Sequence, residues 1–211
     1  MNQGLLSQQS LMKLHIGCFD QPLEGWYNTD ITPHITVSRI PYAADLLHAI
    51  GKLPDHRLSQ HKQGVFKNVH YLDVRKRFPF QDNSVNAVFS SHIIEHLYQK
   101  DARHMLQESL RILSPGSVCR IVAPSLEWAL SLYDEENPEA TVKAILENDH
   151  ANPKNCHQWM YTGKSLVKLM HEIGFTDVES LSFKHGRLPD LERIDNRPEN
   201  SIYVEGIKPE N

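Results

Sequence analysis

The spacing of apolar residues along this chain follows two periods. Short apolar or alternating runs bounded by Gly, Pro and Asn are typical of strands, and apolar residues every three or four positions are typical of amphipathic helices. The remaining polar stretches, such as residues 55–64, are expected to be loops. The runs predict strands at residues 12–17, 26–31, 70–74, 85–90, 117–124, 177–183 and 201–208. Helices are predicted at residues 42–50, 93–97, 101–113, 125–136, 138–149 and 163–175, with Asp101 as an N-cap and Gly174 as a C-terminal stop.

The order of these elements predicts the fold class. Strands and helices alternate over the first two thirds of the chain, which implies an α/β fold: a Rossmann-like three-layer sandwich with a mainly parallel seven-stranded sheet. The two closing strands suggest an antiparallel edge hairpin. Only about a dozen residues separate Gly17 from Asp30, so the first crossover is expected to be abbreviated. We predict one domain over residues 1–211, with a helical insertion or cap at about residues 125–160.

Composition and charge narrow the class of protein. The 211 residues, 40% apolar and 23% charged, suit one globular domain. The formal net charge of −4 argues against general nucleic-acid binding, and three widely spaced cysteines suggest neither a disulfide framework nor a zinc knuckle. No apolar run approaches the roughly 20 residues of a membrane-spanning helix, and the first residues lack the order of a signal peptide. We therefore expect a cytoplasmic protein with no membrane span, and the sequence leaves a homodimer open.

The strongest functional signal lies between Val69 and Leu97. Two predicted strands flank a polar turn there, and the second strand passes through Ser90, Ser91 and His92 into helical spacing. Ligands of open α/β sheets bind at the carboxyl ends of parallel strands, so we expect the chemistry at this corner.

Two earlier strand ends add to this signal. Gly17 would let a bulky ligand approach the backbone closely, although a simple turn glycine is the alternative. Asp30 is placed to accept hydrogen bonds from a ribose diol, as the acidic residue of dinucleotide-binding folds does. A solvated carboxylate at a strand end is an equally common reading of Asp30.

Four sequence blocks together span most of residues 12–209. They are LHIGCFDQPLEGWYNTDI, YLDVRKRFPFQDNSVNAVFSSHIIEHL, ESLRILSPGSVCRIVAPSLE, and HQWMYTGKSLVKLMHEIGF with the ending NRPENSIYVEGIKP. These blocks resemble the class I S-adenosylmethionine (SAM)-dependent methyltransferases, in particular small bacterial members linked to glycan or secondary-metabolite pathways, and they occur in the order of the family.

This resemblance implies SAM as cofactor and methyl transfer to an oxygen or nitrogen of a small-molecule acceptor, with a sugar or glycan precursor as one candidate class. Asp73 would meet the adenine edge, with Val74 supplying backbone and apolar contact, although a turn cap is the alternative for Asp73. Ser90, Ser91 and His92 would line the mouth near the transferred methyl. The cofactor-binding residues expected from the blocks are Gly17, Cys18, Asp30, Ile31, Asp73, Val74, Ser90 and Ser91.

The chain departs from the family's pattern most clearly at Phe19. The family usually has a second glycine there, after strand one, and a bulky side chain is expected to crowd the methionine part of the cofactor. Asn86 in place of an Asp and Ser117 in place of a Gly are milder departures. Phe19 keeps a second hypothesis open: a non-catalytic relative that retains the fold and acts as a partner or scaffold.

A third hypothesis comes from His92, Glu95 and His96, which spell HxxEH. Inverted zinc peptidases place two metal ligands on one helix face with this pattern. Here the pattern begins at a strand-to-helix corner, whereas a metal pair needs a settled helix, and the methyltransferase family shows SSHxxEHL at the same place. Zinc hydrolysis is therefore the least favoured function, no metal site is assigned, and Glu95 and His96 are expected to orient the corner.

Acceptor chemistry suggests further residues. O-methylation of an unactivated hydroxyl needs a group that takes its proton, which a histidine can do near neutral pH, so His92 and His157 are the catalytic candidates. By resemblance, the segment holding His157 and Tyr161 closes over the substrate. Arg187 and Arg197 could hold an anionic acceptor, although solvated surface charges are the commoner reading. The predicted substrate-binding residues are Tyr161, Arg187 and Arg197.

Overall fold

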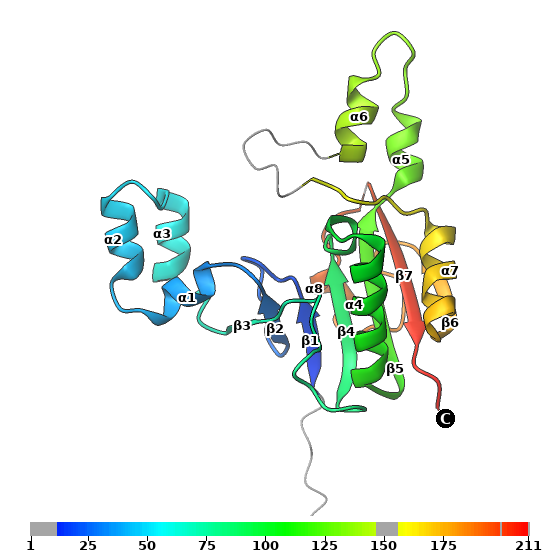
Figure 1. The fold of residues 1–211 in the computed structure, drawn as a ribbon, viewed down its shortest axis with the longest axis horizontal. Coiled ribbons are helices and arrows are strands. Elements are labelled where there is room, and N and C mark those ends of the chain that lie inside the picture. The colour runs from blue at the N-terminus through cyan, green and yellow to red at the C-terminus, as the bar shows by residue number, and fades with distance from the viewer. Residues whose placement is uncertain (1–11, 147–155, 199, 211) are drawn as a thin grey trace, which may run out of the picture.

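The structure, a computed structural model, describes residues 12–146, 156–198 and 200–210. Its centre is a seven-stranded sheet in the order β3-β2-β1-β4-β5-β7-β6 (Figure 1). The pairs among β1 to β5 are parallel, and β7 pairs antiparallel with both β5 and β6. The predicted fold class, with its antiparallel edge hairpin, is confirmed. The strands are β1 (Lys13–Ile16), β2 (Tyr27–Asp30), β3 (Val69–Tyr71), β4 (Val85–Ser91), β5 (Leu113–Pro124), β6 (Thr176–Leu181) and β7 (Ser201–Ile207).

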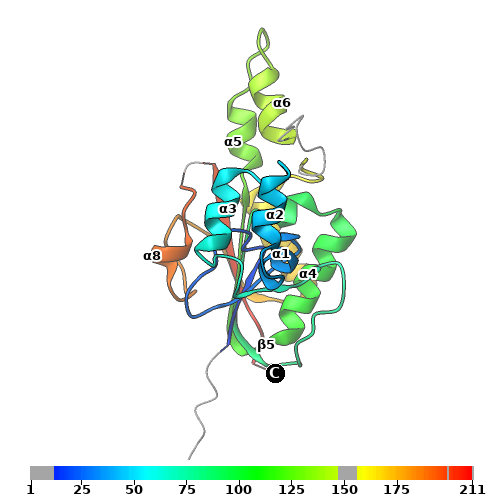
Figure 2. The same ribbon diagram turned by 90° about the vertical axis from the view of Figure 1, so that its left-hand side faces the viewer.

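Unequal layers cover the two faces of the sheet. Helices α4 (Gln99–Ile112) and α7 (Gly163–Ile173) pack on one face, and the short α8 (Leu191–Ile194) with its flanking loop lies on the other (Figures 1 and 2). Val88 of β4 belongs to the larger apolar cluster, whereas Ala87 and Phe89 belong to the smaller one, because alternate strand residues point to opposite faces. The three-layer arrangement is thus present, with one thin outer layer.

The first crossover is abbreviated, as predicted. No helix lies between β1 and β2, and the amide of Asn28 holds the connection together instead. The Asn28 side chain accepts a hydrogen bond from Leu23 N and donates to the carbonyl oxygens of Leu23 and Trp26. The buried amide of Asn28 therefore holds this short connection in place, whereas a longer crossover would contain a helix.

Three helices beside the β3 edge differ partly from the prediction (Figure 1). They are α1 (His34–Arg39), α2 (Ala43–Ala49) and α3 (Asp55–Lys62). The helix predicted at residues 42–50 is confirmed as α2. The loop predicted at residues 55–64 is wrong, and α1 was not predicted. None of the side chains of α3 is buried, so the sequence lacks the apolar period that would reveal a helix.

The corner after β4 also differs from the prediction. The helix expected at residues 93–97 is a single 3-10 turn, η1 (Ile94–His96). Tyr98 is the N-cap of α4, and Asp101 lies in the first turn, so the predicted N-cap is wrong. β5 (Leu113–Pro124) begins directly after α4, four residues before the predicted strand at 117–124, and its first residue pairs with Val85 of β4 ahead of a register shift between Val85 and Ala87.

The elements after β5 are mostly shorter than predicted. α5 (Leu126–Ser131) and α6 (Glu139–Leu146) project beyond the carboxyl ends of β4 and β5 (Figure 1). The predicted end of α6, residues 147–149, lies outside the described residues. The charged stretch at residues 185–200 contains α8, which the sequence did not indicate.

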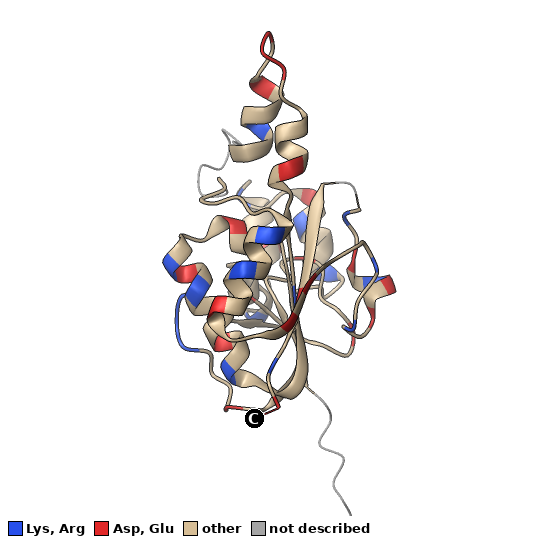
Figure 3. Cartoon of the chain, turned by 90° about the vertical axis from the view of Figure 1, so that its right-hand side faces the viewer, with Lys and Arg blue, Asp and Glu red and all other residues tan. Residues whose placement is uncertain are grey.

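Charges of both signs are interspersed over the helices and loops that face the viewer in Figure 3. Within residues 12–146, 156–198 and 200–210, no helix combines the length and apolar content that a bilayer span requires.

A buried ionic cluster joins the sheet to its thin layer. Arg120 of β5 is fully buried and donates to Asp195 after α8 and to Glu205 of β7, at 2.9 Å from Glu205 Oε1. Arg120 also donates to the carbonyl oxygen of His185, 3.0 Å away. Glu205 in turn accepts the backbone N–H groups of Arg187 and Leu188. The guanidinium therefore fixes the loop that a thin apolar layer alone would hold weakly.

Arg120→Met should destabilise the protein by about 3–5 kcal/mol, because it leaves Asp195 and Glu205 buried without their cation. Arg103→Met is the matched control, since Arg103 and Glu172 form a half-exposed pair whose loss should cost less than about 1 kcal/mol. Urea unfolding of the three proteins measures both values. Equal losses of unfolding free energy in the two variants would show that the buried cluster stabilises the protein no more than the half-exposed ion pair does.

His15 makes the fold sensitive to acid. Burial lowers its pKa from 6.5 to about 4, and its Nδ1 contacts Asn28 Oδ1 at 3.2 Å. The unfolded chain therefore takes up a proton near pH 6.5 that the folded chain resists. The buried neutral His15 therefore contributes fully to the free energy of unfolding above pH 6.5, and this contribution is lost as the pH falls toward 4.

Between pH 7 and pH 5 this proton uptake should lower the free energy of unfolding by about 2 kcal/mol. His15→Gln should remove that part of the pH dependence, since glutamine does not titrate. Urea melts of both proteins at the two pH values provide the measurement. If the two proteins lose the same free energy, other groups cause the acid sensitivity.

Candidate functional site

Four parallel strands end at one level of the sheet. Ile16 of β1 pairs with Thr29 of β2 and with Ser90 of β4, and Asp30 pairs with Tyr71 of β3. The predicted cofactor residues at or just after these positions therefore meet at one edge. This is the edge where open α/β sheets bind their ligands.

Gly17 is the first residue of this edge. Its φ of +76° lies in the left-handed region, and its N–H donates to Thr29 O at 2.8 Å. A Cβ at this position would lie 2.2 Å from Cδ1 of Ile93. The group that packs against Gly17 is thus a side chain of the corner after β4, and the predicted approach of a ligand to this glycine stays a prediction.

Asp30 organises the turn after β1. Its two carboxylate oxygens accept the backbone N–H of Phe19 at 2.9 Å and of Thr32 at 2.7 Å. The Phe19 ring packs against the Arg57 guanidinium of α3, 4.5 Å from the ring centroid, and is 39% exposed. Asp30 and Phe19 therefore lie side by side at the mouth of the edge.

Asp73 lies two residues beyond β3 and is held by Arg75. The guanidinium donates to both carboxylate oxygens, at 2.8 and 3.0 Å, and these hydrogen bonds lower the pKa of Asp73. The neighbouring Val74 is buried in the larger apolar cluster, and Cys18 is buried against Ile35 and Val69. Val74 and Cys18 therefore offer their backbones, and not their side chains, to this edge.

The end of β4 places polar groups beside Gly17. The hydroxyl of Ser90 is buried and has no hydrogen-bond partner among the described residues. His92 has a left-handed φ of 55°, and its Nε2 lies 3.0 Å from Ser201 Oγ of β7. Because His92 stands before η1, the two-histidine helix face of a zinc peptidase is not formed.

A cluster that the sequence did not predict lies at the same corner. Glu95 and His96 of η1 meet His157, which comes from the segment before α7. Tyr161 is buried close by, and burial together with the charge of Glu95 raises its pKa to about 12. Sequence reasoning paired His96 with His92, because nothing in linear spacing reveals that a histidine 61 positions later, at 157 − 96, reaches the same corner.

The two arginines predicted to hold the acceptor are far from equivalent. Arg197 lines a hollow of about 440 Å³ with Trp128, Pro198 and Asn200, next to the start of β7. The guanidinium of Arg187 instead lies 3.5 Å from Glu179 of β6, at the outer edge of the sheet. The structure brings Arg197 to the site and does not bring Arg187 there.

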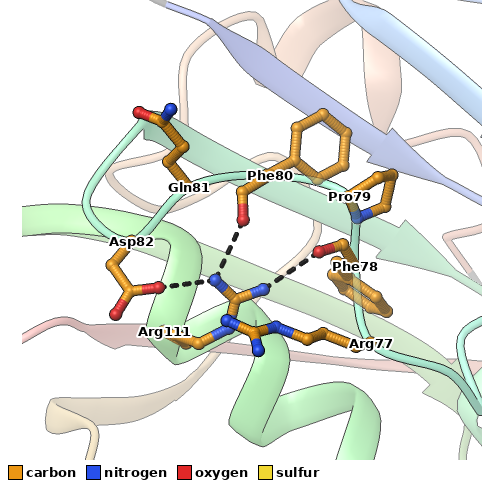
Figure 4. A pocket seen from close by; sticks show the side chains of 7 residues that line it. All are labelled: Arg77, Phe78, Pro79, Phe80, Gln81, Asp82 and Arg111. Atoms are coloured by element: carbon orange, nitrogen blue, oxygen red, sulfur yellow. Dashed lines mark hydrogen bonds and ion pairs between the residues drawn. The ribbon is translucent and has the colours of Figure 1, made fainter.

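A second hollow, of about 550 Å³, lies at the opposite end of β4 (Figure 4). Arg111 spans it and donates to the carbonyl oxygens of Phe78 and Phe80 and to Asp82. These contacts tie down the loop before β4, so the hollow has a structural explanation. It is lined by Arg77, Phe78, Pro79, Phe80, Gln81, Asp82 and Arg111.

Comparison with known proteins agrees with this geometry. A family model described as a methyltransferase domain matches residues 44–121. A SAM-dependent methyltransferase from Methanosarcina mazei superposes with a TM-score of 0.55 at 18% identity, over 95% of this chain and 93% of that one. Residues 44–121 therefore match a methyltransferase domain, and the chain has the fold of solved SAM-dependent methyltransferases.

Two further solved structures share the fold. The SAM-dependent methyltransferase SibL in its apo form matches at 15% identity and a TM-score of 0.50, and PigF with SAH at 11% identity and 0.50. Each match covers 94% of this chain but only 50% of the other, so the chain spans about half the length of these two proteins. These comparisons support SAM as the cofactor.

The residues at the strand ends fit this cofactor. Each oxygen of Asp30 accepts one N–H and keeps a lone pair for a ribose hydroxyl. Ile31 beside it is 56% exposed, an apolar surface suited to a base or ribose. The unpartnered hydroxyl of Ser90 is the kind of buried polar atom that a ligand satisfies. Polar and apolar groups for a nucleoside are thus present together.

Gly17→Ala should destabilise the protein by about 2–4 kcal/mol, because alanine is strained in the left-handed backbone conformation and its Cβ clashes with the side chain of Ile93. Gly51→Ala is the matched control: its φ is +71°, but nothing lies within 4 Å of a Cβ there, so only about 1–2 kcal/mol should be lost. Urea unfolding measures the difference. A Gly17→Ala loss no larger than that of the control would contradict the close packing of Ile93.

Proposed function

We propose that this methyltransferase transfers the methyl group of SAM to an oxygen or nitrogen atom of a small-molecule acceptor, with sugar or glycan precursors as the candidate class. One observation carries the proposal. Gly17, Asp30, Asp73 and Ser90 lie at or just after the ends of four adjacent parallel strands at one edge, with His92 directly after β4. A nucleoside cofactor held there lies next to groups that can accept a proton.

The chain's own residues bind and orient the reactants. The bound cofactor supplies a sulfonium methyl group that is open to in-line attack, so correct placement of the acceptor contributes much of the acceleration. Asp30 would hold the ribose, Asp73 the adenine edge, and Ser90 and Ser91 the end nearest the transferred methyl. Arg75 has to share or release Asp73 for that contact.

Two histidines are the residues that we propose to take the acceptor's proton. His92 lies at the end of β4 and is held by Ser201 of β7. His157 has its Nδ1 3.0 Å from the carbonyl oxygen of Ile145, so its Nε2 carries the lone pair that can receive a proton. Either imidazole could take the proton of a hydroxyl acceptor as a general base.

The acceptor site that we propose is the hollow at Trp128 and Arg197. Its volume of about 440 Å³ suits a small molecule, and Arg197 offers two-pronged recognition of a carboxylate or phosphate. Trp128 comes from α5, so residues 125–160 would act as a cap of a single domain, and Tyr161 would form the inner wall.

Wild-type protein should bind SAM and S-adenosylhomocysteine in calorimetric titrations. Asp30→Ala should weaken the binding of both ligands by about 1–3 kcal/mol, because the ribose loses its pair of hydrogen bonds. Asp55→Ala serves as the matched control, since Asp55 is a solvent-exposed carboxylate of α3 and should leave the affinity unchanged. Equal affinity for wild type and folded Asp30→Ala would remove Asp30 from the cofactor site.

Phe19→Gly tests whether the bulky side chain restricts the cofactor. Glycine tolerates the φ of 43° found at this position, so the turn should survive. Binding that appears only in Phe19→Gly would mean that the site is built but obstructed. No binding by either folded protein would overturn the proposal in favour of a non-catalytic relative.

A further inference from the structure

Three metal-ligating side chains converge at the corner after β4. One ligand atom each from Glu95, His96 and His157 lies within 4.8 Å of the other two, and the two imidazole centroids are 5.2 Å apart. The main chain holds the two segments together, because the N–H groups of Gln158 and Trp159 donate to Glu95 O at 2.7 and 3.1 Å. Backbone hydrogen bonds therefore enforce the convergence.

Glu95 is buried without the partners that a carboxylate normally has. Its side chain is 1% exposed, and neither oxygen accepts a hydrogen bond from any described residue. His92 Nδ1 and His96 Nε2 lie 3.3 and 3.9 Å from Oε1, and neither contact has hydrogen-bond geometry. Buried carboxylates are as a rule paired or bound to a metal, so this one indicates a missing cation.

His157 has the orientation of a metal ligand. A carbonyl oxygen can only accept, so the contact of Nδ1 with Ile145 O places the proton on Nδ1 and makes Nε2 the ring nitrogen that could coordinate an ion. Metal-binding histidines commonly donate their second N–H in this way, which fixes both tautomer and ring orientation. The backbone N–H of His157 donates to Leu146 O at 3.0 Å and anchors the residue further.

We propose that Glu95, His96 and His157 bind a divalent first-row transition-metal ion such as Zn²⁺ or Mn²⁺. Two imidazole nitrogens and one carboxylate oxygen suit these ions better than Mg²⁺ or Ca²⁺, which prefer oxygen ligands. Three protein ligands leave coordination positions open, as catalytic metal sites require.

The ion has a clear use at this corner, and that use rests on the proposed methyl transfer. It would polarise an acceptor hydroxyl, which loses its proton to His92 while the bond from oxygen to the methyl carbon forms and the bond from that carbon to sulfur breaks. His157 then serves as a ligand, and His92 remains as the base. The ion would also neutralise the buried charge of Glu95.

The test begins with the full chain stripped of metal with EDTA and titrated calorimetrically with ZnCl₂, MnCl₂ and MgCl₂ in the absence of cofactor. We expect one equivalent of Zn²⁺ or Mn²⁺ to bind, and Mg²⁺ to bind at least about tenfold more weakly. The melting temperature should rise with the bound ion, because only the folded chain assembles the three ligands.

Variants separate the proposed ligands from their neighbours. Glu95→Gln and His157→Asn should each lower the affinity at least about 100-fold. His92→Asn and the exposed His171→Asn should retain it. Glu95→Gln should also raise the melting temperature of the metal-free protein, since it removes a buried charge, whereas a merely structural Glu95 would be destabilised by the same change.

Several results would overturn the metal site. The first is a wild-type protein that binds no ion, and the second is a His157→Asn variant that binds the ion as tightly as wild type. The third is loss of ion binding in His92→Asn but not in His157→Asn, which would indicate a site built from HxxEH alone. Loss of ion binding with SAM binding intact would overturn this inference only. Loss of SAM binding with ion binding intact would overturn only the proposed function.

Discussion

The second face of the sheet depends on one buried cation. Few apolar residues of α8 and its loop pack against β4, β5 and β7, and Arg120 adds the contacts that this thin layer lacks. A guanidinium has five donors in a fixed plane, so it can join two carboxylates and a carbonyl from three segments in one geometry. Because Glu205 also accepts two backbone N–H groups, the position of β7 and of the loop follow from the same cluster.

The position of β7 matters for the functional edge. Ser201, at its start, contacts His92, and Arg197 stands just before it in the proposed acceptor hollow. The ionic cluster on the face covered by α8 therefore also helps to position the start of β7 relative to the end of β4. Packing on this face and the geometry of the proposed site are thus connected through β7.

The corner after β4 concentrates three roles in four residues. His92 turns toward β7 through a left-handed backbone, Ile93 packs on Gly17, and Glu95 and His96 face His157. A regular helix starting at His92 would place its side chains on one surface in steps of about 100°. The irregular backbone from His92 through the 3-10 turn instead lets nearby side chains point toward the proposed cofactor edge, the core and the proposed metal site.

The sequence by itself determined the sheet, its parallel direction and the abbreviated first crossover, because strand periodicity and connection length are local properties. It also determined which residues end the strands, and hence Gly17, Asp30 and Ser90. Helix α3 stayed hidden, since its exposed side chains carry no apolar period. Only the tertiary structure decided that Arg187 lies at the outer edge, that Arg75 holds Asp73, and that His157 reaches Glu95 and His96. These contacts join segments far apart along the chain, and their geometry depends on how loops return to the sheet.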